Sequence, residues 1–354
     1  MKHIVEIIPN LEYGGAQRMV VDLINNSDSD KYRFTVIVFF DNLPLKSLIK
    51  KNVEVILVEK KSQFDFSFLD RLQSKLKDLK PDLVHGHLFG GDFWGRLATH
   101  RLSVPFLTTE HNLNYADGFW KNFFKRVVSS KKDYYAACSM AVSDYMRSVY
   151  NIKKEIMVIY NGIDLDRFSH LPPVSWQEPI SFLIVGRMEK QKGHLIALQA
   201  LSNLKDYLWN LTIVGSGTEE GRIVEFIEKN NLSSRVSLVK PVTDIEKYYA
   251  QADVLLMPSL WEGLGVVPME VMASGRLVLC SKVDGLREIV HDQETGFLAN
   301  PKSLADWQEK IQYILENKNK CQPIIKNAQH YASENFGLEQ MVDKYDKLFS
   351  LVIR

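Results

Sequence analysis

The chain has 354 residues, which is more than one typical core accommodates, so we expect two domains. Hydrophobic residues make up 45% of the chain and charged residues 25%, which is ample material for buried cores. The formal net charge of +1 excludes binding of nucleic acid through overall basicity, so any anion site must come from local clusters of charge.

Apolar runs alternate with amphipathic stretches over the first half of the chain. Strands are predicted at 4–8, 34–40, 53–58, 82–85, 106–109, 134–137 and 156–159. The helical patterns between them include 16–24, 68–79 and 140–149. Such strongly apolar strands are typical of a parallel sheet that is covered on both faces. The alternation of strands and helices itself predicts βαβ units.

The segment 171–179 interrupts this alternation with several prolines, and we interpret it as a linker. Strands are then predicted at 180–185, 211–214, 236–239, 254–257 and 277–280, and helices at 303–316, 324–333 and 338–352. The predicted fold class is therefore α/β, with two doubly wound, Rossmann-like parallel-sheet domains. Ligand is expected at the carboxyl ends of the strands.

The cysteines and the N-terminal residues indicate the cellular compartment in which the protein is expected. The three cysteines, Cys138, Cys280 and Cys321, are far apart and odd in number, which argues against a disulfide framework and for a reducing compartment. The first residues enter a strand pattern without signal-peptide features, and no apolar run reaches the ~20 residues of a membrane span. We expect a cytoplasmic protein, with contact at the inner face of the membrane left open.

Gly14 and Gly15 lie between the first predicted strand and the helix that follows it. Glycines let the backbone turn sharply and approach a ligand, and a helix N-terminus attracts an anion. The pair predicts either an anion-binding turn or an ordinary strand-to-helix turn.

A second loop, 186–193, follows the first strand of the second domain and contains Arg187 and Lys192. The guanidinium and the ammonium both suit phosphate oxygens. Because Lys190 is equally charged, a solvated basic loop is the alternative interpretation.

The stretch 214–221 contains three glycines but lacks the G-x-G-x-x-G spacing of a dinucleotide fingerprint. It also lies after a later strand of its domain. We therefore expect a turn that lines a nucleotide pocket or only closes the strand, and no nicotinamide site.

The most informative motif places the carboxylates Glu262 and Glu270 around Gly263 and Gly265. Carboxylates accept paired hydrogen bonds from sugar hydroxyls, and the glycines leave backbone amides open to a ligand. Pro268 indicates the start of a helix, with Glu270 expected in its first turn. The alternative is one acid on a loop and one on a helix, without a shared ligand.

Taken in this order, these motifs resemble the retaining GT-B glycosyltransferases of family 4, the glycosyl transferases of group 1. Residues 160–164 and 295–297 extend the resemblance over nearly the whole chain. It implies that Arg187 and Lys192 bind the donor diphosphate, that Glu270 binds the ribose hydroxyls, and that Glu262 contacts the donor sugar. We also assign to donor binding the glycines and the loop residue between them: Gly14, Gly15, Gly263, Leu264 and Gly265.

The chain departs from the family pattern at three places. Leu264 stands where many members have Phe, Asp284-Gly285 where many have two glycines, and Leu277 where Pro is frequent. These differences bear on the choice of sugar, and they leave the proposed phosphate and ribose contacts in place.

Three histidines follow predicted strands. The resemblance implies that His111 contacts a hydroxyl of the transferred sugar or stabilises charge near the reaction centre, and a loop histidine without such a role is the alternative. His85 and His87 have metal-ligand chemistry, but the sequence shows no clear third ligand, so no metal is expected.

The segment 119–132 interleaves Lys and Arg with large aromatic residues and contains no acid. This pattern suits an anionic membrane interface, or equally an amphipathic helix whose aromatic residues pack into the core. Nucleic acid is not an expected partner, because no recognition module accompanies the segment.

The resulting expectation is an acceptor-binding domain at 1–170, completed by the helix 338–354, and a nucleotide-sugar-binding domain at 171–337, the two facing a cleft. The resemblance implies a metal-independent hexosyl- or N-acetylhexosaminyltransferase that uses a UDP-sugar donor. Its acceptor would be a glycan or lipid-linked hydroxyl, as in bacterial surface polysaccharide assembly. The alternatives are a sugar-nucleotide epimerase or hydrolase of the same fold, and a non-catalytic nucleotide-sugar-binding protein.

Overall fold

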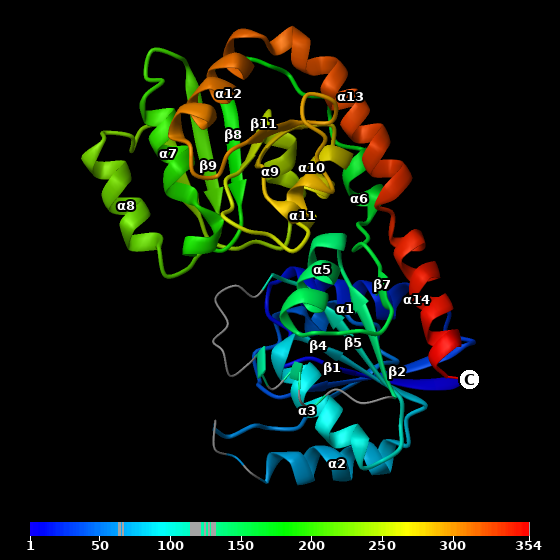
Figure 1. The fold of residues 1–354 in the computed structure, drawn as a ribbon. Coiled ribbons are helices and arrows are strands. Elements are labelled where there is room, and N and C mark those ends of the chain that lie inside the picture. The colour runs from blue at the N-terminus through cyan, green and yellow to red at the C-terminus, as the bar shows by residue number, and fades with distance from the viewer. Residues whose placement is uncertain are drawn as a thin grey trace. The chain divides into compact units, whose positions relative to one another are not determined.

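The computed structural model describes residues 1–62, 65, 67–113, 122, 123, 125, 126, 128 and 132–353. The chain forms two compact units, of which unit 1 is Met1–Gly162 with Leu338–Arg354, and unit 2 is Ile163–Gly337. Each unit consists of a parallel sheet with helices packed against it (Figure 1).

The sheet of unit 1 has seven strands in the order β3-β2-β1-β4-β5-β6-β7. All neighbouring strands are parallel. The order reverses between β1 and β4, and the crevice at such a switch point is where ligands bind in doubly wound sheets. The strands are β1 (Lys2–Ile7), β2 (Tyr32–Val38), β3 (Glu54–Leu57), β4 (Leu83–His87), β5 (Phe106–Glu110), β6 (Asp133–Ala137) and β7 (Ile156–Val158).

Helices cover both faces of this sheet. Ile4 of β1 belongs to a core shared with α1 (Gly15–Asn26) and α14 (Leu338–Val352). The next residue, Val5, belongs to a second core shared with α2 (Phe68–Leu79) and α3 (Leu88–His100). Successive side chains of a strand point to opposite faces, so β1 is buried on both sides. The remaining elements are η1 (Pro44–Leu48) and α5 (Met140–Val149).

The sheet of unit 2 has six parallel strands in the order β10-β9-β8-β11-β12-β13. Its switch point lies between β8 and β11. Trp209 and Trp307 are fully buried in one large core beside α7 and α12. The strands are β8 (Ile180–Val185), β9 (Trp209–Val214), β10 (Val236–Val239), β11 (Val254–Met257), β12 (Leu277–Ser281) and β13 (Phe297–Ala299).

The helices of unit 2 place its functional loops. The short helix η2 (Lys190–Lys192) lies between β8 and α7, and α10 (Val266–Ala273) lies between β11 and β12. The others are α6 (Leu165–Ser169), α7 (His194–Ser202), α8 (Glu220–Lys229), α9 (Glu246–Gln251), α11 (Asp284–Arg287), α12 (Leu304–Glu316) and α13 (Lys318–Asn335).

The α/β class with two Rossmann-like sheets is confirmed, as are all the predicted strands within a few residues. Two details differ from the sequence analysis. The strand β13 was not predicted. The helix α6 was placed in the first domain by the boundary at 170, but it packs in unit 2, where the ring centroids of Phe168 and Tyr249 are 5.7 Å apart. None of the described helices combines the length and the apolar character needed to cross a bilayer.

Candidate functional site

The two loops that follow β8 and β11 are tied to each other by backbone and side-chain contacts. The Leu260 amide donates to the Gln191 carbonyl at 2.7 Å, and the Gln191 side chain donates to the Trp261 carbonyl at 2.9 Å. Gly193 has a φ of 62°, and a Cβ there would lie 2.1 Å from the Pro258 carbonyl oxygen. Only glycine therefore allows the two loops to come this close.

This contact between the loops brings Lys192 and Glu262 together. Lys192 Nζ donates to Glu262 Oε1 at 2.6 Å, and the side chains are 19% and 9% exposed. The pair lies at the carboxyl ends of the strands that flank the switch point of unit 2. The sequence analysis placed one residue in each of two separate motifs, and the fold joins them.

Arg187 lies in the same loop after β8, and its side chain is exposed. The loop is held by the turn at 214–221, because the Met188 amide donates to the Ser216 carbonyl at 2.8 Å. A Cβ at Gly215 or Gly217 would lie 2.0 Å or 2.4 Å from a backbone oxygen of this loop. Gly215 and Gly217 are thus explained by close packing against the loop that carries Arg187, whereas a Cβ at Gly221 would meet nothing within 4 Å.

Glu270 lies on α10, where Tyr249 Oη donates to its Oε2 at 2.6 Å. Burial, with Glu270 beside it, raises the pKa of Tyr249 well above its ordinary value, so the phenol remains a donor. The expectation that Glu270 lies in the first turn is wrong. The helix begins at Val266, before Pro268, and its first turn contains no acid.

The loop from Glu262 to Gly265 is shaped by two further constraints. Gly265 has a φ of 99°, a conformation that favours glycine, and Leu264 is 3% exposed. A Cβ at Gly285 would lie 2.4 Å from the Glu262 carbonyl oxygen and 2.5 Å from that of Gly263. Gly285 therefore allows α11 to support this loop.

Sequence reasoning missed His194, the first residue of α7, two positions after Lys192. The side chain is buried, and neither ring nitrogen has a hydrogen-bond partner among the described residues. Burial, together with nearby Lys192, lowers the pKa of His194 to about 4. Its ring is therefore neutral beside the cationic loop.

In unit 1, Gly14 and Gly15 lie where β1 leads into α1. Both are exposed, Gly14 is the N-cap of the helix, and Gly15 is its first residue. The helix N-terminus therefore presents backbone amides at the switch point of this sheet.

Unit 1 also contains a buried polar cluster. Glu6 accepts hydrogen bonds from His85 Nδ1 at 3.2 Å and from His87 Nε2 at 2.6 Å, and all three side chains are inaccessible. The sequence analysis found no clear third ligand for a metal, whereas the structure places Glu6 beside both histidines. Their ligand atoms lie within 4.8 Å of one another, which is close enough for a cation.

His111 follows β5 and extends this cluster, with His87 Nδ1 3.0 Å from His111 Nε2. Burial first, and then His87, lowers the pKa of His111 well below 6.5. The neutral ring favours a hydroxyl contact over stabilisation of charge. The His111 Nδ1 atom is buried and has no partner among the described residues.

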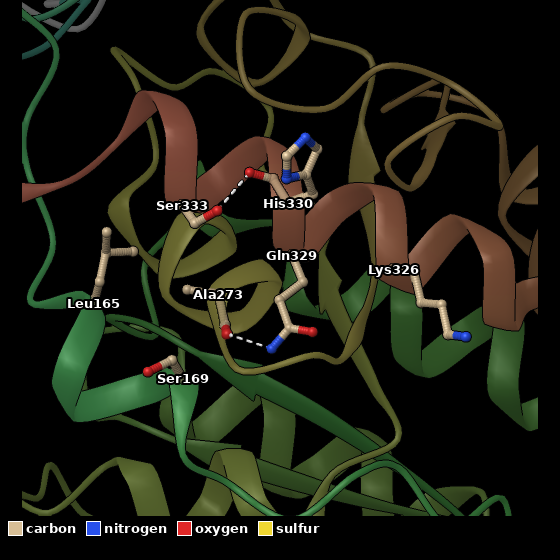
Figure 2. A pocket seen from close by; sticks show the side chains of 7 residues that line it. All are labelled: Leu165, Ser169, Ala273, Lys326, Gln329, His330 and Ser333. Carbon is tan, nitrogen blue, oxygen red and sulfur yellow. Dashed lines mark hydrogen bonds between the residues drawn. The ribbon is translucent and has the colours of Figure 1, made fainter.

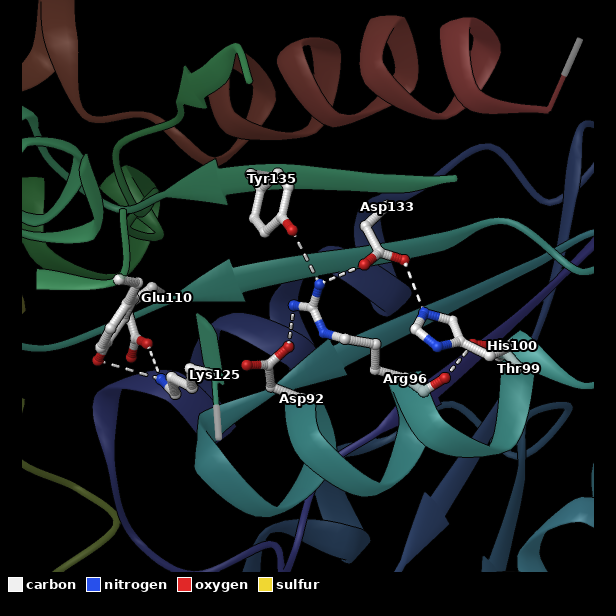
Figure 3. Close-up of polar contacts among 9 residues, drawn as sticks. Asp92, Arg96, Thr99, His100, Glu110, Lys125, Asp133 and Tyr135 are labelled. Atoms are coloured by element: carbon white, nitrogen blue, oxygen red, sulfur yellow. Dashed lines mark hydrogen bonds and ion pairs between the residues drawn. The ribbon is translucent and has the colours of Figure 1, made fainter. Parts of the chain in front are cut away.

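Only part of the segment 119–132 belongs to the described residues, and Phe119, Trp120 and Lys121 lie outside them. Lys125, which the membrane hypothesis treated as an exposed cation, is 5% exposed. It forms an ion pair with Glu110 and donates to Tyr150 Oη at 3.2 Å (Figure 3). Phe123 and Arg126 are exposed, and the Arg126 side chain donates to the Val149 carbonyl at 2.7 Å.

Figure 3 also shows a second buried network, in which the Arg96 side chain extends from α3 toward β6. Arg96 forms an ion pair with Asp92 and another, at 2.6 Å, with Asp133. It also donates to Tyr135 Oη at 3.0 Å. Because each charge has a partner, we interpret this network as structural.

A pocket of about 330 Å³ lies in unit 2 between α6 and α13 (Figure 2). The Gln329 amide donates to the Ala273 carbonyl at 3.3 Å, and Ser333 Oγ donates to the His330 carbonyl at 2.7 Å. None of the residues predicted to bind the donor lines this pocket, so it is not assigned to the site. Its lining is Leu165, Ser169, Ala273, Lys326, Gln329, His330 and Ser333.

The fold and the charged loops together define a class of protein. Two Rossmann-like units, each with its polar residues at a switch point, form the GT-B architecture. Residues 170–331 match the glycosyl transferases of group 1, and residues 13–167 match glycosyltransferase family 4. The chain belongs to the glycosyl transferases of group 1.

Individual relatives agree with this assignment. An uncharacterized glycosyltransferase of Methanocaldococcus jannaschii is 28% identical over 274 residues, which cover 76% of this chain and 75% of the relative. The putative glycosyltransferase EpsF of Bacillus subtilis is 26% identical over 337 residues, or 88% and 87% of the two chains. The crystal structure of Anabaena HepE in complex with UDP and glucose has a TM-score of 0.88 at 20% identity, and covers 98% of this chain and 99% of that one.

Proposed function

We propose that this glycosyltransferase moves a sugar from a UDP-linked donor to an acceptor hydroxyl and retains the anomeric configuration. The observation that carries the proposal is the placement of Lys192 and Glu262, 2.6 Å apart, at the switch point of unit 2. An ammonium suits a diphosphate, and a carboxylate suits the hydroxyls of the sugar attached to it.

The cations of this site act on the leaving group. Cleavage of the bond between sugar and phosphate builds negative charge on the departing diphosphate. Arg187 offers an exposed guanidinium to that charge, and Lys192 has three N–H donors, one of which Glu262 occupies. Preorganised donors of this kind stabilise the transition state more than the ground state. They supply the charge compensation that a metal would provide, so we propose transfer without a metal.

Glu270 is proposed to accept hydrogen bonds from the ribose hydroxyls of the nucleotide. The Tyr249 hydroxyl holds one carboxylate oxygen at 2.6 Å, which orients the group before the nucleotide arrives. Binding then requires little reorganisation of this side chain. The choice of a UDP-linked donor is supported by HepE, whose structure contains UDP.

In the proposed reaction the acceptor attacks from the face that the diphosphate leaves. The departing phosphate oxygen takes the proton of the acceptor hydroxyl while the new glycosidic bond forms. The configuration is thereby retained, and no protein side chain is assigned as a separate base.

Unit 1, with α14, is proposed to bind the acceptor through the carboxyl ends of its strands. A glycan or lipid-linked acceptor, as in surface polysaccharide assembly at the inner face of the membrane, is supported by exposed Phe123 and Arg126. Sedimentation with anionic liposomes tests the membrane part. Arg126→Ser should reduce the bound fraction, whereas equal recovery of this variant and wild type would count against membrane contact.

The function itself is tested by incubation with a panel of nucleotide sugars and hydroxyl acceptors, with NMR of the product anomeric centre. We expect acceptor-dependent product with the configuration of the donor. Conversion of donor without acceptor would instead indicate an epimerase or hydrolase. Tight UDP binding without turnover over the whole panel would indicate a nucleotide-sugar-binding protein.

A further inference from the structure

A row of polar side chains, buried at Glu6 and His87, crosses neighbouring strands of unit 1 and ends at half-buried His111. Glu6 is on β1, His87 is the last residue of β4, and His111 follows β5. These strands are adjacent in the sheet, and their carboxyl ends lie beside its switch point. The row therefore links the sheet interior to the region where ligands bind in such folds.

The first hydrogen bond of the row fixes the proton on His87. Although burial acts to raise it, His85 and His87 together lower the pKa of Glu6 to about 2, so its carboxylate only accepts. His87 Nε2, at 2.6 Å from Glu6, must therefore carry a proton. Burial, with His85, lowers the pKa of His87 to about 4, so the ring is neutral and its Nδ1 is an acceptor.

The second hydrogen bond then fixes the proton on His111. Its Nε2 lies 3.0 Å from His87 Nδ1 and must donate, because His87 Nδ1 has only a lone pair to offer. The ring of His111 is neutral, so its single proton is on Nε2 and its Nδ1 carries a lone pair. That Nδ1 atom is buried and without a partner among the described residues. A buried polar atom without a partner is rare in folded proteins and destabilises the ligand-free state.

We infer that His87 is a positioning residue, which holds His111 in the tautomer whose Nδ1 accepts a hydrogen bond from a hydroxyl of the transferred sugar. This inference rests on the proposed function. It specifies the direction of the hydrogen bond at His111 Nδ1, because the sugar group that meets this atom must be the donor. A sugar with fluorine in place of that hydroxyl offers only an acceptor there and is selected against.

A metal held by Glu6, His85 and His87 would reverse the direction of the hydrogen bond between His87 and His111. Metal at His87 Nε2 would displace the proton there, and the neutral ring would carry it on Nδ1. His87 would then donate to His111 Nε2, and the single proton of neutral His111 would lie on Nδ1. A metal and the proposed tautomer therefore exclude each other.

The experiment is NMR of the histidine ring nitrogens in the ¹⁵N-labelled full chain at neutral pH, with the His111 signals assigned through a His111→Asn variant. We expect a protonated Nε2 and an unprotonated Nδ1 on His111, and no stoichiometric metal by elemental analysis. A His111 protonated on Nδ1, or one bound metal per chain, would overturn the inference.

Three variants separate positioning from a merely structural role. His87→Phe removes the acceptor for His111 and should give mixed tautomers. His87→Gln should restore the wild-type tautomer, because its amide can donate to Glu6 and accept from His111. Thr109→Val is the matched control, since Thr109 contacts His85 at 2.8 Å, away from the bond between His87 and His111. It should leave the His111 tautomer unchanged. A wild-type tautomer in His87→Phe would contradict the inference.

Turnover is measured with the donor that the panel identifies. kcat/KM should fall roughly ten- to hundredfold in His87→Phe, as expected for one misdirected hydrogen bond, and recover in His87→Gln. Wild-type kcat/KM in His87→Phe would overturn the role of His87. If no donor supports transfer, the proposed function fails, and with it the sugar contact. The tautomer measurement needs no substrate and still decides whether His87 sets the proton on His111.

Discussion

Lys192 Nζ and Glu262 Oε1 are 2.6 Å apart although the residues belong to loops after two different strands, β8 and β11. The pair is largely shielded from water, so each charge depends on the other in the ligand-free chain. An incoming diphosphate competes with Glu262 for the ammonium of Lys192. We therefore interpret the pair as a preformed site in which the carboxylate keeps the lysine side chain oriented.

The roles of Lys192 and Glu262 separate in the variant Glu262→Gln. The carboxylate is proposed to contact the sugar and not the diphosphate, so kcat/KM for transfer should fall on the order of a hundredfold. The affinity for UDP alone should stay the same or increase, because Lys192 loses a competing anion. Steady-state kinetics and UDP titration check this. Weaker UDP binding together with unchanged turnover would contradict the assignment.

The ribose contact of Glu270 predicts a change in nucleotide discrimination. Wild type should bind UDP more tightly than its 2′,3′-dideoxy analogue, by about 1–3 kcal/mol for hydrogen bonds to a charged group. Glu270→Ala should bind both nucleotides with similar, weaker affinity. Competition titration measures the difference. If Glu270→Ala discriminates as well as wild type, the ribose hydroxyls are recognised elsewhere.

Gly285 predicts that the loop carrying Glu262 depends on close support from α11. Gly285→Ala would place a Cβ 2.4 Å from the Glu262 carbonyl oxygen, so the loop must shift. We expect a lower melting temperature and a loss of turnover of at least tenfold. Gly221→Ala is the control, because nothing lies within 4 Å of its Cβ and alanine favours the helix by up to about 1 kcal/mol. Equal behaviour of the two variants would show that the loop tolerates displacement.

The neutral buried histidines predict that stability falls in mild acid. His87 has a pKa of about 4 in the fold, below its ordinary value of 6.5, so the unfolded chain binds more protons between these two pH values. The neutral His87 ring contributes fully to the free energy of unfolding above pH 6.5. This contribution is lost as the pH falls toward 4, at about 1.4 kcal/mol per pH unit for one histidine. Glu6, at about 2, adds a loss below its ordinary pKa of 4.5. His87→Gln should have a shallower pH dependence of the unfolding free energy than wild type, whereas exposed His170→Gln should match wild type. Identical slopes in all three proteins would contradict the neutral state of His87.

The sequence predicts most of the fold, because long apolar runs separated by amphipathic stretches leave few alternatives. The sequence is less informative where tertiary packing decides whether a segment forms a helix or a strand. The helix α3 contains Gly91 and Gly95, which weaken the helix signal. In the fold, a Cβ at Gly91 would lie 2.2 Å from the Ile7 carbonyl oxygen, so close packing requires these glycines. The strand β13, Phe297–Ala299, is too short to show a period.

The residues proposed to bind the donor could be singled out because each lies in a motif after a strand, but their pairing could not be predicted. Tyr249, the partner of Glu270, lies on α9, outside every motif. Glu6 is a single acid in an apolar strand, 79 positions from His85. Only the parallel register of β1 and β4, which places Glu6 opposite His85, brings the two together. Such neighbours depend on the strand order and cannot be read from local sequence.

The central claim is that unit 2 holds a nucleoside diphosphate against Lys192, and equilibrium titration of UDP tests it most directly. Wild type, Lys192→Ala and Lys190→Ala form the matched set, because Lys190 is an exposed cation on the same short helix. We predict a Kd for UDP at least about tenfold higher in Lys192→Ala, the effect of roughly 1.4 kcal/mol, and unchanged in Lys190→Ala. Equal UDP affinity in all three proteins would contradict the account.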